Sequence, residues 1–151
     1  MKKAVVTCLA LFLFTGLLGA QSNTDIEKEK AAIQKVIDKA YIQGVFIKRD
    51  AEAMAKGFHA DFNMLLVHDD HMHAYPISKW IESTKKNKEK NPNPPKEKFT
   101  YKIPLLDVTG YAAIAKIEIY RDSKHIYSDY MSLYKFGDSW QIVNKIFYEH
   151  K

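Results

Sequence analysis

Hydrophobic and polar positions follow two different periods along the chain. Between residues 25 and 48, apolar residues recur every three or four positions, which predicts one long amphipathic helix. From residue 99 onward the period changes to two and continues through four runs of ten to twelve residues, a pattern typical of long β-strands. Helical spacing first and strand spacing afterwards predict an α+β fold, with the helices packed on one face of a curved antiparallel sheet.

Turn and capping residues set the bounds of the other elements. Asp50 is suited to cap a short second helix, and Gly57 to end it. Pairs such as Asp69–Asp70 and Thr109–Gly110 are suited to tight turns between strands. In chain order, the pattern predicts helices over 25–48, 51–56 and 76–86, and strands over 58–67, 71–75, 99–108, 111–121, 125–136 and 139–149.

The first twenty residues have the layout of a secretory signal peptide. Lys2 and Lys3 form a positive start, an apolar run of about 15 residues follows, and Gly19–Ala20 are small. The run is shorter than the roughly 20 residues that a membrane-spanning helix needs. We therefore expect cleavage after Ala20, an exported domain over residues 21–151, and no membrane attachment after cleavage. The alternative is a membrane anchor.

Removal of this segment changes the charge and the chemistry that remain. The net formal charge falls from +5 to +3, and Cys8, the only cysteine, is lost, which excludes disulfides and thiol chemistry from the exported domain. Six lysines and two glutamates gather in residues 85–98, a Pro-rich stretch that we expect to be a solvated loop. A nucleic-acid partner is not expected, because the chain has only Arg49 and Arg121 for bidentate phosphate or base contacts.

Two stretches resemble a known family. They are "YPISKWIE" over residues 75–82 and "SDYMSLYKFGDSWQIVNKIFYEH" over residues 128–150. With the order of the expected elements, residues 25–151 resemble the nuclear transport factor 2-like superfamily, and within it the small exported proteins described as putative lumazine-binding. The resemblance implies a cone-shaped α+β fold. Relatives on this fold include ketosteroid-isomerase-like and polyketide-cyclase-like enzymes, dehydratases, and binding or dimerisation modules, so the fold does not choose a function.

Asp129 is the first candidate site residue. By alternation its side chain shares a face with Tyr127, Met131 and Leu133, which are apolar or aromatic. A carboxylate on such a face is unfavourable unless it is paired or hydrogen-bonded. Asp129 is therefore expected to act as a general base or ligand anchor, or else to bind a backbone amide or Lys145 of the neighbouring strand.

Asn144 and three aromatic residues are the next candidates for a ligand pocket. Alternation places Asn144 on the face of Trp140, Ile142 and Ile146, where it would bond either a ligand or the adjacent strand. The rings of the aromatic candidates would line the same pocket or belong to the core. These three are Tyr41, Trp80 and Tyr111.

The histidines offer two further candidates. His59, close to Asp61 where the chain enters the sheet, is suited to acid–base work or to a bond with the backbone at the helix end. His68, His71 and His73 share one face of the expected hairpin, where they form a weak candidate for a zinc or copper site or simply an exposed hairpin tip. We expect no cofactor and no metal.

The sequence therefore predicts an exported, periplasmic or secreted, domain that binds a small and partly apolar molecule. One alternative is an acid–base enzyme of the isomerase, cyclase or dehydratase type, with Asp129 or His59 as the base. The other is an interaction module without a ligand, a homodimer formed through the outer face of the sheet. By alternation that face carries Ser128, Tyr130, Ser132 and Tyr134.

Overall fold

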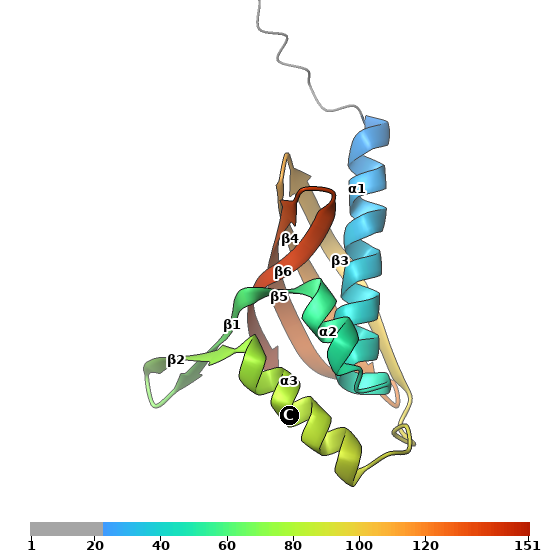
Figure 1. Ribbon diagram of the computed structural model, residues 1–151, viewed down its shortest axis with the longest axis vertical. Helices are drawn as coiled ribbons and strands as arrows, with labels where there is room; N and C mark the ends of the chain where they lie inside the picture. Colours follow the sequence, from blue (N-terminus) through green and yellow to red (C-terminus); the bar gives the residue numbers. More distant parts are fainter. Residues whose placement is uncertain (1–22) are drawn as a thin grey trace, which may run out of the picture.

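The computed structural model describes residues 23–151, so the predicted signal peptide over residues 1–20 lies outside the described part (Figure 1). A long helix opens the described chain and lies along the sheet. It is α-helical over α1 (Asn23–Val36) and π-helical over η1 (Ile37–Ile47). One long helix was expected here, but the change to π geometry was not. No helix within residues 23–151 has the length and hydropathy needed to cross a membrane.

A short helix and a hairpin follow. Asp50 caps α2 (Ala51–Gly57) as predicted, because its Oδ1 accepts hydrogen bonds from the backbone N–H groups of Glu52 and Ala53, at 3.1 and 3.0 Å. β1 (Phe58–His68) and β2 (His71–Pro76) form a hairpin whose turn is the expected Asp69–Asp70 pair. The hairpin projects away from the rest of the fold, and α3 (Ile77–Lys90) returns from it (Figure 1).

Four long strands complete the chain. β3 (Phe99–Thr109), β4 (Ala112–Arg121), β5 (Lys124–Phe136) and β6 (Ser139–Glu149) pair as an antiparallel meander, as predicted. The hairpin joins this meander through a parallel pairing of β1 with β6. The six strands therefore form one curved sheet in the order β2-β1-β6-β5-β4-β3. The parallel contact is the part of the topology that alternation alone did not predict.

The core lies between the long helix and the inner face of the sheet. Ile33, Ile37 and Tyr41 of the helix are fully buried, and they lie against inward residues of β4 and β5 such as Ile117 and Met131. Alternation of buried and exposed positions along β4 and β5 matches the period of two read from the sequence. The fold is the predicted α+β cone, with the helix packed on one face of the sheet.

Most element bounds lie within one or two residues of the expected ones, and two differences matter for the interpretation. Gly110 has a φ of +57°, a conformation that glycine adopts without strain, so it begins the β3–β4 turn and Tyr111 completes it. Tyr111 is therefore a turn residue and not the first residue of a strand. The helix α3 continues to Lys90, so residues 85–90 are helical and the solvated loop is limited to residues 91–98.

Candidate functional site

Three polar side chains meet inside the core of the cone. Tyr41 donates a hydrogen bond to Oδ2 of Asp129, and Lys145 donates one to the Tyr41 hydroxyl oxygen at 2.6 Å. Nζ of Lys145 also lies 2.9 Å from Oδ1 of Asp129, which is ion-pair distance, although no hydrogen bond of good geometry reaches that oxygen. Tyr41 and Asp129 are fully buried and Lys145 is 4% exposed. We call these three residues the interior triad.

Each member of the triad comes from a different element. Tyr41 lies in the middle of η1, and Asp129 and Lys145 lie on the inner faces of β5 and β6. The register pairs Met131 of β5 with Lys145 and Phe147 of β6 with Asp129, so the two charged residues are diagonal neighbours on one face. π-Helical turns are rare and occur often at functional sites.

Aromatic rings surround the ammonium group of Lys145. Nζ lies 4.7 Å from the ring centroid of Phe147, 4.8 Å from that of Tyr41, 5.5 Å from that of Trp80 and 6.0 Å from that of Tyr127. Ring faces at these distances attract a cation. We call these four rings the aromatic cage; Trp80, Tyr127 and Phe147 are only partly buried, so the cage has a side near the solvent.

Burial and charge change the proton affinities within the triad. Burial lowers the pKa of the Lys145 ammonium from its ordinary value near 10.5, and the neighbouring Asp129 carboxylate opposes part of this change. Burial, followed by the charge of Asp129, raises the pKa of the Tyr41 phenol well above 10. Tyr41 therefore remains a hydrogen-bond donor at neutral pH, and the Lys145 proton is held less tightly than that of an exposed lysine.

Trp80 belongs to a separate helix, α3, and connects that helix to the triad. Its ring lies 6.1 Å from that of Tyr41, 5.6 Å from that of Phe58 and 6.0 Å from that of Phe62. The helix that carries it packs against α2 and the β1–β2 hairpin. One wall of the cage is therefore supplied by an element outside the long helix and the meander.

A groove of about 430 Å³ is lined in part by Phe58. His59 lines it together with Phe58, Ile77 and Gln141, so its wall is apolar with a few polar groups. The His59 ring stacks on Phe136 at 4.6 Å, and its Nδ1 accepts a hydrogen bond from the backbone N–H of Asp61 at 3.2 Å. His59 thus lies at the groove and makes the backbone bond that was one of its two expected roles.

Asn144 and Tyr111 are not part of the triad. The pairing of β5 with β6 shifts between Ser132 and Leu133, and this irregularity places Asn144 opposite Ser132 on the outer face of the sheet. Its Nδ2 donates to the backbone carbonyl of Asn63 in β1 at 3.0 Å, which is the adjacent-strand bond considered above. Tyr111 is 73% exposed in its turn, so the expectation that it lines a pocket with Tyr41 and Trp80 was wrong.

The hairpin histidines are exposed. His68 pairs with His71 across the turn, as the sequence predicted, and His73 lies farther along the same strand. His68 contacts Asp69 with Nε2 3.2 Å from Oδ2, on side chains that are both more than four-fifths exposed. Over residues 23–151, no three His, Cys, Asp or Glu side chains are grouped so that they could hold a metal ion.

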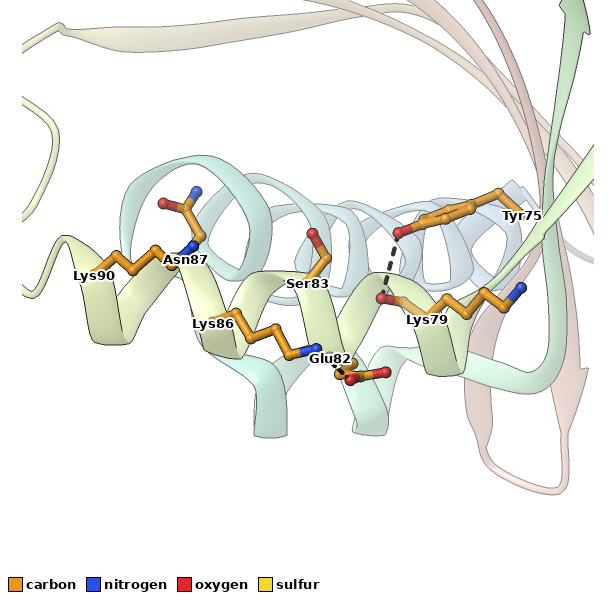
Figure 2. A pocket seen from close by; sticks show the side chains of 7 residues that line it. All are labelled: Tyr75, Lys79, Glu82, Ser83, Lys86, Asn87 and Lys90. Atoms are coloured by element: carbon orange, nitrogen blue, oxygen red, sulfur yellow. Dashed lines mark hydrogen bonds and ion pairs between the residues drawn. The ribbon is translucent and has the colours of Figure 1, made fainter.

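An open hollow of about 640 Å³ lies along α3 (Figure 2). Lys79, Lys86 and Lys90 line it with Tyr75, whose hydroxyl donates to the backbone carbonyl of Lys79 at 3.3 Å. Glu82 is the one acidic residue of its lining, and it is paired with Lys86 at 2.6 Å. The hollow is basic and lies on the outside of the helix, and none of the predicted site residues lines it.

Sequence reasoning named Lys145 only as one possible partner of Asp129, yet it is the centre of the site. The signal that could have identified it is its position on an inward face. Asp129 and Lys145 are the charged members of otherwise apolar inner faces of adjacent strands. Two opposite charges at such positions are more favourable together than apart.

Comparison with known proteins places the chain in a family. The model of the family described as putative lumazine-binding matches residues 28–148. The chain belongs to this family. No curated protein matches the chain.

Solved structures with the same architecture are similar to this chain over most of its length. A nuclear transport factor 2-like protein of unknown function from Shewanella baltica is 24% identical, with a TM-score of 0.65, over 83% of this chain and 96% of its own. One from Silicibacter pomeroyi is 14% identical, with a TM-score of 0.66, over 83% and 98%. One from Methylobacillus flagellatus is 25% identical, with a TM-score of 0.62, over 86% and 95%. The fold is therefore that of the nuclear transport factor 2-like superfamily.

Proposed function

We propose that this protein is exported and binds a small, partly apolar molecule beside the interior triad. The observation that carries the proposal is the burial of Asp129 and Lys145 among aromatic rings. A buried ion pair is seldom more stabilising than well-packed apolar side chains, so its presence favours a functional role. An apolar wall with a few convergent polar groups is the usual composition of a small-molecule site. The family description supports a ligand-binding role in general terms.

The triad is closed in this structure, so binding requires a ring to move. Trp80 is the best candidate, because it is only partly buried and belongs to α3, which packs against α2 and the hairpin. Displacement of its ring would connect the cage with the solvent. The groove beside Phe58 then offers an apolar surface next to the opening, since Phe58 contacts both the groove and Trp80.

Native mass spectrometry of the protein purified from a bacterial periplasm tests this function. We expect a bound mass that disappears on denaturation, and a smaller bound fraction in Tyr41→Phe, which keeps the ring and loses the hydroxyl. Tyr120→Phe is the matched control, because Tyr120 also donates to a carboxylate, that of Glu118 at 2.9 Å, but outside the core. A bare wild-type protein would contradict tight binding. The same spectra test export, because the mass shows whether residues 1–20 have been removed.

A second candidate function is dimerisation through the outer face of the sheet. Tyr130, Tyr134 and Ile146 are each 47–51% exposed there, and Tyr148 is 62% exposed. Exposed apolar groups gathered on one face are typical of interaction surfaces. Light scattering coupled to size exclusion measures the oligomeric state, and Tyr134→Lys would dissociate such a dimer. A monomeric wild-type protein over the accessible concentration range would contradict this function.

A further inference from the structure

Lys145 is the only buried lysine in the described part of the chain, residues 23–151. Its amine contacts a hydrogen-bond acceptor and a hydroxyl group at once: Oδ1 of Asp129 at 2.9 Å and the Tyr41 hydroxyl at 2.6 Å. A proton acceptor and a proton donor beside an amine are the groups that addition of the amine to a carbonyl requires. The Tyr41 hydroxyl bonds to both members of the ion pair, although the two charged groups also contact each other directly.

We propose that Lys145 is a nucleophilic amine that forms a reversible imine with a small, uncharged and apolar aldehyde or ketone. This inference names the ligand class of the interior site, so it rests on the proposed binding function. It goes beyond that function because it assigns a covalent step to one atom, Nζ of Lys145.

The amine can lose its proton within the triad. Burial among the cage rings disfavours the ammonium form and lowers its pKa, as in lysines that act as nucleophiles. Transfer of that proton to Asp129, directly or through the Tyr41 hydroxyl, replaces two buried charges by two neutral groups. A low-dielectric surrounding favours such a neutral pair when the attraction between the two charges does not offset the cost of removing both from water.

The reaction then balances with the groups present. The Nζ lone pair attacks the carbonyl carbon and forms a C–N bond, while the carbonyl oxygen takes the proton held by Asp129 and the nitrogen returns one to the carboxylate. The resulting carbinolamine loses its hydroxyl as water, with the Tyr41–Asp129 pair supplying the proton. The C–O bond breaks, the C=N bond forms, and an iminium ion is left beside the Asp129 carboxylate. Water reverses each step, and no oxidant or reductant is needed.

The surroundings select the carbonyl compound. The walls are the rings of Phe147, Tyr41, Trp80 and Tyr127, which favour an apolar body. An α-keto acid or another anion would place a second negative charge next to Asp129, which is fully buried. Repulsion between two carboxylates in such a place is strong, so we expect anionic carbonyl compounds to be rejected.

Reductive trapping tests the proposal on the purified protein. Propanal with sodium cyanoborohydride converts an iminium ion into a stable propyl amine, and peptide mapping then locates the label. We expect faster labelling at Lys145 than at the exposed Lys124 at pH 7, because burial lowers the pKa of the Lys145 ammonium. Glyoxylate, the anionic probe, is expected to reverse the preference between the two lysines.

Two controls keep the result interpretable. Tyr41→Phe, checked for folding by circular dichroism, should lower the labelling rate of Lys145 and leave that of Lys124 unchanged. An unlabelled Lys145 in a wild-type sample whose Lys124 is labelled would overturn the proposal, and so would equal rates in wild type and Tyr41→Phe. Propan-1-ol, which cannot form an imine, tests binding separately: a shift of the Trp80 indole N–H resonance without trapping by propanal would refute the imine and retain the binding site.

Discussion

Replacement of Lys145 by Met is the most informative perturbation of the site. Met has a similar length and no charge, so it fills the same space and leaves the Asp129 carboxylate buried without its partner. Tyr41 would still donate its hydrogen bond to Oδ2, but Oδ1, which no hydrogen bond reaches, would lose the ammonium group that lies 2.9 Å away. The variant therefore measures how much the Lys145 charge contributes to the free energy of unfolding.

The expected loss of unfolding free energy is large for a single substitution. Removing one partner of a buried ion pair typically costs about 3–5 kcal/mol, and the remaining Tyr41 bond places this case near the lower end, at about 3 kcal/mol. Asp129→Asn should cost about as much, because it leaves the Lys145 ammonium buried without a counter-charge. The double variant should lose no more than about 3 kcal/mol, and not the sum of both, since Asn still accepts the Tyr41 hydrogen bond and no unpaired charge remains.

Urea denaturation of the four proteins, followed by circular dichroism, gives the free energies and the coupling between the two positions. We expect a coupling of about 3 kcal/mol or more, at or above the upper end for residues in contact. Lys116→Met is the matched control, because Lys116 and Glu118 form a partly exposed ion pair at 3.3 Å. This substitution should change the free energy of unfolding by about 1 kcal/mol or less. Additive losses at Lys145 and Asp129 would refute the reasoning, because they would mean that each side chain is stabilised independently.

Three further predictions concern other parts of the fold. Burial raises the pKa of Tyr41, so the unfolded chain loses the phenol proton at a lower pH than the folded protein does. The stability that Tyr41 contributes is therefore present below pH 10 and is lost as the pH rises above 10. Urea titrations at pH 8–11 should show a smaller alkaline loss of stability in Tyr41→Phe than in the wild type. Gly57→Ala should destabilise the fold by about 2 kcal/mol or more in the same assay, because the new Cβ would lie 2.2 Å from Cβ of Ala40. Glu29→Ala should cost about 1–2 kcal/mol, because Glu29 accepts a hydrogen bond from the Trp140 indole at 2.6 Å.

Each of these has a control within the chain. Tyr120→Phe should keep the full alkaline loss that is due to Tyr41. Gly44→Ala meets a flexible Met54 side chain at 3.0 Å and no backbone atom nearer than 3.5 Å, so it should destabilise less than Gly57→Ala. Glu27→Ala removes an exposed pair with Lys30 and should change stability by less than about 0.5 kcal/mol. Equal effects in a variant and its control would contradict the corresponding prediction.

Most of the fold could be predicted because its elements are encoded locally. The cap at Asp50, the turn at Asp69–Asp70 and the alternation along β5 each depend on residues that are neighbours in the chain. The parallel contact between β1 and β6 and the π geometry of η1 depend on tertiary packing, which no local pattern records. Tyr111 was misplaced for a smaller reason, a turn that began one residue later than expected.

The site was predictable where a residue violated its local pattern. Asp129 is such a residue, and its burial on an apolar face could be inferred from alternation alone. Asn144 could not be placed, because the irregular pairing beside Ser132 changes which residues of β6 point inward. The distances within the triad also depend on the position of the long helix over the sheet, which sets where the Tyr41 hydroxyl reaches.

The parallel pairing of β1 with β6 has a consequence for the order of folding. Asn63 and Asn144, which bond across this contact, are 81 positions apart, whereas β5 and β6 are joined by a two-residue turn. Contacts between distant segments form slowly, because the chain between them must lose its freedom before the contact stabilises anything. The meander can therefore assemble early, whereas the β1–β2 hairpin can join the sheet only after β6 has formed. Until then Phe58 and Phe62 lack their final surroundings, so the first half of the chain depends on the last strand to become native.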